Sequence, residues 1–106
     1  MGSKYHAKKV KDGDLVFDSR KEYRRWQELL LLEKAGVIKG LRRQVKYELL
    51  PRVPGKWPRP VTYIADFVYR EGKKEVVEDV KGYKTDVYKL KKRLMWVVYG
   101  IEIRET

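Results

Sequence analysis

Two acidic residues and a lysine stand in stretches of the chain that are otherwise apolar, and they are the residues best able to do chemistry. Asp66 lies within residues 63–69, a run of aromatic and aliphatic residues, and Asp79 and Lys81 follow Val76-Val77. A charge in such a stretch is costly unless it is paired or bound to a metal ion. Because strand side chains alternate, Asp79 and Lys81 share one face of an extended strand.

A turn at Glu71-Gly72-Lys73 would pair the two segments and make Asp66 and Asp79 cross-strand neighbours, or nearly so. Two facing carboxylates repel each other unless a cation lies between them. Glu22 supplies a third acid, because it precedes Trp26 by one helical turn and so shares the apolar face of a predicted helix. Three carboxylates from three elements would form the kind of oxygen-rich cage that Mg²⁺ or Mn²⁺ prefers.

Each acid also has a purely structural interpretation. Ser19 and Glu22 have the spacing of a capping box, which explains Glu22 as well as a metal site does. Asp66 could pair with an arginine, and Asp79 with Lys81 could form a solvated strand edge. The convergence of three acids from three elements, in a chain this basic, favours the site.

Composition excludes several other kinds of chemistry. The chain has 106 residues, no cysteine and one histidine, His6, which excludes thiol catalysis and disulfide scaffolds and disfavours histidine-based catalysis. Lysine and arginine total 26 against 15 acids, giving a net charge of +11. This excess suits a polyanionic partner, nucleic acid first and an anionic membrane surface second. Any enzyme chemistry must therefore come from carboxylates, lysines and a bound cation.

The elements that position these residues follow from hydrophobic periodicity and turn residues. Helical spacing predicts two helices, and Ser19 and Thr85 are their N-caps. β-Branched and aromatic residues predict four strands. The predicted ranges are 20–35 and 86–99 for the helices and 45–49, 61–70, 74–81 and 101–103 for the strands.

The order α-β-β-β-α-β predicts one α/β domain over residues 15–106, with a mixed β-sheet flanked by helices. Residues 1–14 are expected to form a flexible basic arm that ends in a turn at Asp12-Gly13. All four prolines fall within residues 51–60, which predicts a stiff extended loop. Trp57 in this loop could be a core plug, a dimer contact or a wedge against bases.

The second predicted helix combines an apolar stripe with a basic surface. Its apolar residues at helical spacing are Val87, Leu90, Leu94 and Val97 with Val98. The candidates for phosphate contact are Lys84, Tyr88, Lys91 and Lys92 around this helix, together with Lys8 and Lys9 in the arm. A run of lysines is often only a solvated helix face, but the overall charge favours contact with nucleic acid.

The three acids and Lys81 resemble the PD-(D/E)xK nuclease signature, although Ala65 replaces its proline and Asp79 its commoner glutamate. The chain is still more similar to a phage-encoded family of uncharacterised proteins related to Holliday junction resolvases. The features that carry this similarity are the start Lys4-Tyr5 with Ala7-Lys8-Lys9, then Phe17-Asp18-Ser19-Arg20-Lys21-Glu22, Gln44, Ala65-Asp66-Phe67-Val68-Tyr69, Val77-Glu78-Asp79-Val80-Lys81-Gly82 and Tyr99-Gly100-Ile101-Glu102-Ile103-Arg104-Glu105.

The resemblance implies a restriction-endonuclease-like domain and a division of roles. Asp66, Asp79 and the Val80 carbonyl would hold Mg²⁺ or Mn²⁺, and Glu22 would complete the shell directly or through water. Lys81 would orient the attacking water or the phosphate. Gln44 would line the site or be an ordinary edge-strand residue, and Glu78 leaves the identity of the second acid open.

We therefore expect a metal-dependent DNA endonuclease, and on resemblance alone one selective for branched or junction DNA in phage replication or recombination. Two cuts need two sites, so a homodimer is expected. The alternative is a non-catalytic nucleic-acid-binding module, and a membrane-surface protein ranks third. No leader or membrane-spanning segment is recognisable, so a cytoplasmic location in the infected host is expected.

Overall fold

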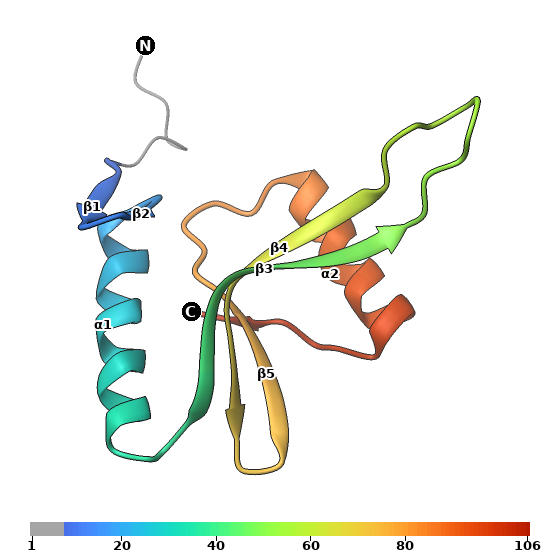
Figure 1. Ribbon diagram of the computed structural model, residues 1–106. Coiled ribbons are helices and arrows are strands. Elements are labelled where there is room, and N and C mark those ends of the chain that lie inside the picture. Colours follow the sequence, from blue (N-terminus) through green and yellow to red (C-terminus); the bar gives the residue numbers. More distant parts are fainter. Residues whose placement is uncertain (1–7) are drawn as a thin grey trace.

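The computed structural model describes residues 8–106, and the expected α/β class is confirmed. A short hairpin precedes a helix, a three-strand meander, a second helix and a last strand (Figure 1). The elements are β1 (Val10–Asp12), β2 (Leu15–Phe17), α1 (Arg20–Lys34), β3 (Lys39–Leu50), β4 (Val61–Glu71), β5 (Lys74–Asp79), α2 (Asp86–Tyr99) and β6 (Arg104–Glu105).

Both helices begin at the caps that the sequence indicates. The Ser19 Oγ accepts a hydrogen bond from the Glu22 amide at 3.1 Å, and the Thr85 Oγ1 accepts one from the Tyr88 amide at 3.1 Å. Each bond satisfies an amide that would otherwise lack a partner in the first helical turn. Gly100 ends α2 with φ 67°, a left-handed conformation that suits glycine.

The main sheet has the strand order β3-β4-β5-β6, antiparallel except for the parallel pair β5–β6. β3 begins earlier than predicted, because Lys39 and the following residues already pair with the far end of β4. The last strand begins later in the sequence than the predicted range 101–103. Ile103 packs in the core, and Arg104 and Glu105 make the pairing with β5 instead.

The strands lie between α1 and α2 (Figure 1), so β4 and β5 are buried on both faces. Phe67 and Val76 pack with Leu29 of α1. Val68 and Val77 belong to a second cluster that includes Met95 of α2. Burial on both faces explains why these strands are almost continuously apolar.

The apolar stripe of α2 does not face the core. Tyr88 and Met95 are the buried residues of this helix, while Val87, Leu90 and Val97 are 62%, 57% and 69% exposed. The exception is Leu94, which is partly buried against the core cluster. The helix is apolar on more than one side, so periodicity alone does not select the buried side.

The N-terminal segment contains more structure than a flexible arm. Val10 pairs with Phe17 and Asp12 with Leu15, so the turn falls at residues 13–14 rather than at Asp12-Gly13. Phe17 is fully buried and anchors this hairpin. The rest of the predicted arm, residues 1–7, lies outside the described residues.

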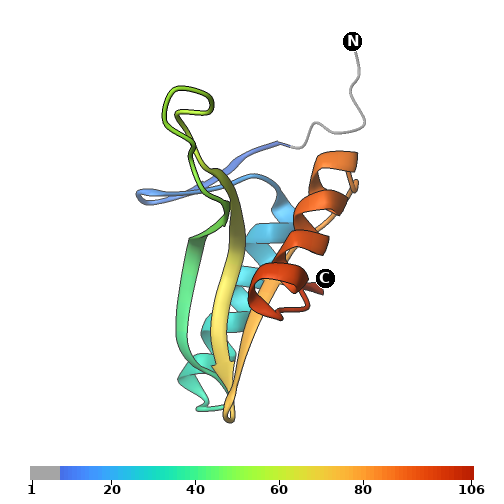
Figure 2. The ribbon, with the colours of Figure 1, turned by 90° about the vertical axis from the view of Figure 1, so that its right-hand side faces the viewer.

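The proline-rich segment 51–60 forms the tip of the long β3–β4 hairpin, which projects beyond the body of the protein (Figures 1 and 2). β3 is bent along its length (Figure 1). Within this strand Gln44 has a φ of 52°, which is left-handed and unusual for a residue with a side chain. No helix within residues 8–106 is long and apolar enough to cross a membrane.

Candidate active site

All four predicted catalytic residues line one pocket of about 750 Å³. Glu22 comes from the first turn of α1, Asp66 from β4, Asp79 from the end of β5, and Lys81 from the segment that follows. The helix cap and the two strands thus bring together side chains that are far apart in the sequence.

Asp66 and Asp79 form the centre of the pocket. The register pairs Phe67 with Glu78, so the next residues along, Asp66 and Asp79, face each other as predicted. The Val80 amide donates to Asp66 Oδ2 at 2.9 Å, and the Tyr63 hydroxyl donates to Asp79 Oδ2 at 2.7 Å. Burial and the hydrogen bond and charge of Asp79 raise the pKa of Asp66 to about 9. The two carboxyl groups therefore retain a proton at neutral pH unless a cation replaces it.

Lys81 is held beside this pair. Its Nζ lies 3.3 Å from Asp79 Oδ2 and 4.1 Å from the centroid of the Tyr88 ring. Asp79 is only 2% exposed, which rules out a solvated strand edge. The Lys21 ammonium donates to the Lys81 carbonyl at 3.1 Å, so a second lysine fixes the backbone here.

Glu22 combines both of its sequence interpretations. It lies in the capping turn, and its Oε1 accepts from the Asp18 amide at 3.3 Å. Its Oε2 is buried and has no hydrogen-bond partner within residues 8–106, although Arg43 Nη2 lies 3.6 Å away. Burial, the largest of several influences, raises the pKa of Glu22. One carboxylate oxygen thus holds the segment that leads into the helix, and the other faces Arg43.

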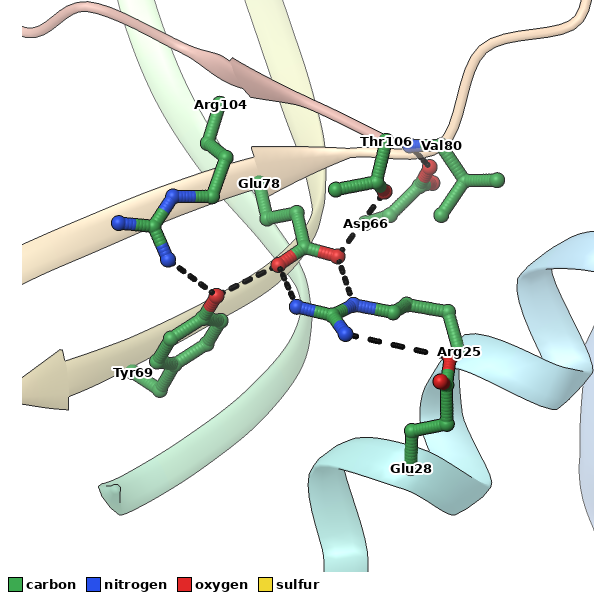
Figure 3. A network of polar contacts seen from close by, with 8 residues as sticks. All are labelled: Arg25, Glu28, Asp66, Tyr69, Glu78, Val80, Arg104 and Thr106. Atoms are coloured by element: carbon green, nitrogen blue, oxygen red, sulfur yellow. Dashed lines mark hydrogen bonds and ion pairs between the residues drawn. The ribbon is translucent and has the colours of Figure 1, made fainter. Parts of the chain in front are cut away.

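Glu78 faces away from the pocket and has a different role. Its side chain is fully buried and receives a two-pronged ion pair from Arg25 at 2.6 and 3.0 Å (Figure 3). The Tyr69 hydroxyl donates to it at 2.5 Å and the Thr106 hydroxyl at 3.1 Å. The acid of β5 that lines the pocket is therefore Asp79.

A family model described as "Protein of unknown function (DUF1064)" matches residues 2–105, nearly the whole chain. The chain belongs to the DUF1064 family. No curated protein and no solved structure matches it. Membership of the DUF1064 family assigns no activity, so the chemistry must be inferred from the side chains of the pocket.

Of the residues predicted to contact nucleic acid in this DUF1064 chain, some line the pocket and others lie outside it. Gln44, Tyr88 and Lys91 line the pocket, although Tyr88 is largely buried and donates its hydroxyl to Glu105 at 2.7 Å. Lys84 and Lys92 are instead paired with Glu105, at 3.0 and 3.2 Å.

In the arm, Lys9 pairs with Asp18 at 2.9 Å and Lys8 is exposed. Sequence reasoning missed Tyr63, Lys21 and Arg43. Their only sequence signal is proximity: Tyr63 shares a strand with Asp66, Lys21 precedes Glu22, and Arg43 precedes Gln44.

The donors of the DUF1064 pocket fit a divalent cation. Within residues 8–106 no three histidine, cysteine or acidic side chains lie close enough together to hold a metal ion as they stand. However, Glu22 Oε2 is a buried oxygen without a hydrogen-bond partner in this part of the chain, and the Asp66–Asp79 pair is stabilised by a proton in the absence of a cation. Carboxylate oxygens are the ligands of Mg²⁺ and Mn²⁺, and ligands must lose their protons to bind.

A pH-dependent stabilisation by Mg²⁺ is the expected result of this proton exchange. Because the pKa of Asp66 is raised to about 9, the folded protein keeps a proton that the unfolded chain releases above about pH 4. The free energy of unfolding of the metal-free protein therefore falls as the pH rises towards 9. Mg²⁺ removes that loss, so the increase in Tm that it causes is larger near pH 8.5 than near pH 6. Thermal unfolding at both pH values checks this, and an equal increase would contradict it.

Proposed function

We propose that this chain is a divalent-metal-dependent endonuclease that hydrolyses phosphodiester bonds in DNA. The observation that carries the proposal is the half-buried Asp66 facing the buried Asp79, with the Lys81 ammonium beside them, in one pocket of a chain with a net charge of +11. A preference for branched or junction DNA, in phage replication or recombination inside the infected cell, rests on the family resemblance.

The residues of the pocket would have different roles in the reaction. Asp66, Asp79 and Glu22 would hold the cation, with the Val80 carbonyl as a fourth donor. A bound divalent cation supplies a lowered pKa for water and stabilises negative charge on the phosphate. The Tyr63 hydroxyl fixes one oxygen of Asp79 and thereby orients the carboxylate. Lys81 is placed to position the attacking water or a phosphate oxygen.

The electrostatics of the pocket suit an approaching phosphodiester. Lys21, Lys81 and Lys91 line it together with the acids, so cations surround a small acidic centre. The lysines attract the backbone of DNA. Without a cation, the carboxylates would repel the phosphate, so the metal is needed for the scissile phosphate to approach the acidic centre rather than for DNA to bind the surrounding lysines.

A cleavage assay on linear, flapped and four-way DNA, with Mg²⁺, with Mn²⁺ and with a chelator, tests the proposal. We expect cutting only with the metal, and faster cutting of the branched substrates. The second candidate is the non-catalytic binding module, which the net charge of +11 and the lysines around the pocket favour without any cutting. Steeply salt-dependent DNA binding without cutting of any substrate would replace the nuclease by that module.

The expected homodimer stays a prediction, and the exposed stripe of α2 is the surface that we assign to it. Two antiparallel α2 helices would place Val87 of one copy against Val97 of the other, with Leu90 between these contacts, so the exposed part of the stripe is complementary to itself. A second copy would cover apolar surface that is otherwise in contact with water.

Light scattering or sedimentation should give twice the 12.7 kDa chain mass for the wild type, and Leu90→Asp should give the monomer. Leu31→Asp is the matched control, because Leu31 is 67% exposed on α1, outside the stripe. A monomeric wild type, or dissociation by the control alone, would exclude this interface.

A further inference from the structure

The tip of the β3–β4 hairpin, residues 51–60, is a loop held by its own backbone hydrogen bonds, and we call it the Trp57 tip. The Val53 amide donates to the Trp57 carbonyl and the Trp57 amide to the Val53 carbonyl, both at 2.7 Å. The Lys56 amide also donates to the Val53 carbonyl, at 3.0 Å. The four prolines fix further backbone angles. The loop is therefore held in one shape while it projects from the body (Figure 1).

The surface of the tip combines an exposed indole with cations. Trp57 is 63% exposed, which excludes the core-plug interpretation. Arg52, Lys56 and Arg59 lie in the same ten-residue segment, which contains no acid. The Lys56 ammonium lies 5.8 Å from the centroid of the Trp57 ring. Keeping a large aromatic side chain in water on a rigid projection points to a partner that covers it.

This combination matches nucleic acid with unpaired bases. An aromatic ring stacks on a base of any type, and nearby cations contact the adjacent phosphates. A second copy of this chain fits less well, because the tip is purely cationic and the chain carries a net charge of +11. Contact between two such surfaces would be repulsive.

The tip is directly connected to the pocket. β4 runs from Val61 at the base of the tip to Asp66 in the pocket, and Thr62 and Ile64 between them line the pocket wall. At about 3.3 Å per strand residue, this stretch spans roughly 17 Å. The whole path from Trp57 to Asp66 reaches at most about 30 Å. At about 3.4 Å per base step, these limits correspond to roughly 5–9 nucleotides.

We propose that the Trp57 tip stacks on unpaired bases at a branch point and thereby sets where the pocket cuts. The part of this proposal that concerns the position of the cut rests on the proposed nuclease function. The part that concerns stacking on bases does not depend on cutting. The tip would give the selectivity for branched DNA that the resemblance only suggests, and cuts would fall about 5–9 nucleotides from the branch.

Fluorescence anisotropy with a chelator present measures binding without cutting. The probes are a flapped duplex with a single-stranded arm, a duplex with an internal unpaired loop, and a fully paired duplex of equal length. Trp57→Ala should weaken binding of the first two by about tenfold or more and leave the third within about twofold. Trp57→Phe should restore most of the loss. Trp96→Ala, which removes an equally exposed indole from α2, should change none of them.

The outcomes separate this proposal from the nuclease. Equal binding by Trp57→Ala and wild type, or equal weakening on all three probes, would overturn the stacking role. A change of oligomeric state in Trp57→Ala would overturn it in favour of a protein contact. If wild type cuts no DNA, the nuclease fails while the binding result still decides the role of the tip. If it cuts, unchanged cut positions in Trp57→Ala would overturn the positioning role.

Discussion

Asp79→Asn is expected to reduce metal-dependent DNA cleavage by at least about a thousandfold, because the cation contributes several kcal/mol at the phosphate and each 1.36 kcal/mol is a factor of ten. The substitution keeps the size of the side chain and an oxygen that can accept from the Tyr63 hydroxyl. It removes one of two facing carboxylates, so the fold should persist and DNA binding should be retained or become tighter.

Thermal unfolding, anisotropy and gel-based cleavage on the same preparation separate these effects. Glu102→Gln is the matched control, since it also removes one negative charge but from an exposed side chain outside the pocket. Cutting by Asp79→Asn at the wild-type rate would refute the site. A loss of cutting accompanied by a loss of folding would leave Asp79→Ala and Asp66→Asn to decide, and their continued activity would refute it equally.

Arg25→Met is expected to destabilise the fold by about 3–5 kcal/mol, the largest stability effect that the contacts of the described residues indicate. Glu78 is fully buried and both of its oxygens are engaged by Arg25 (Figure 3). Without Arg25 it would be left as a buried carboxylate with only the Tyr69 and Thr106 hydroxyls as donors. The cost is the unpaired charge rather than the lost contact.

Chemical denaturation of a small set of variants tests this explanation. Arg25→Met combined with Glu78→Met should recover most of the lost free energy of unfolding, because no buried charge remains. Arg42→Met breaks the ion pair with Glu75, whose side chains are 55% and 44% exposed, and should cost at most about 1 kcal/mol. A double variant as unstable as Arg25→Met alone would show that the arginine acts through packing.

Local signals predicted much of the framework and the centre of the site. Ser19 and Thr85 are strong capping residues, so both helices start where expected. The tight turn after Glu71 fixes the hairpin register, and that register places Asp66 opposite Asp79. These features depend on neighbours in the chain, which is why a single sequence reveals them.

Features that depend on distant residues could not be predicted. Arg25 and Glu78 are separated by 53 positions, and nothing in the sequence marks them as partners. The outward orientation of the α2 stripe follows from the burial of Tyr88 and Met95 against the sheet. The left-handed conformation of Gln44 lacks the glycine that would usually signal it.

The separation of Glu78 from Asp79 has a consequence for how the strands align during folding. A slip of β5 by one position would keep the residue type at two of the four positions Val76-Val77-Glu78-Asp79, and at the other two it would exchange a valine and an acid. Every side chain would also change face, so burial of an unpaired acid penalises the misaligned hairpin. Arg25 on one face and Tyr63 on the other distinguish the two acids. The buried Arg25–Glu78 ion pair thus favours the native strand alignment over the shifted one. In that alignment the Asp79 carboxylate faces the pocket.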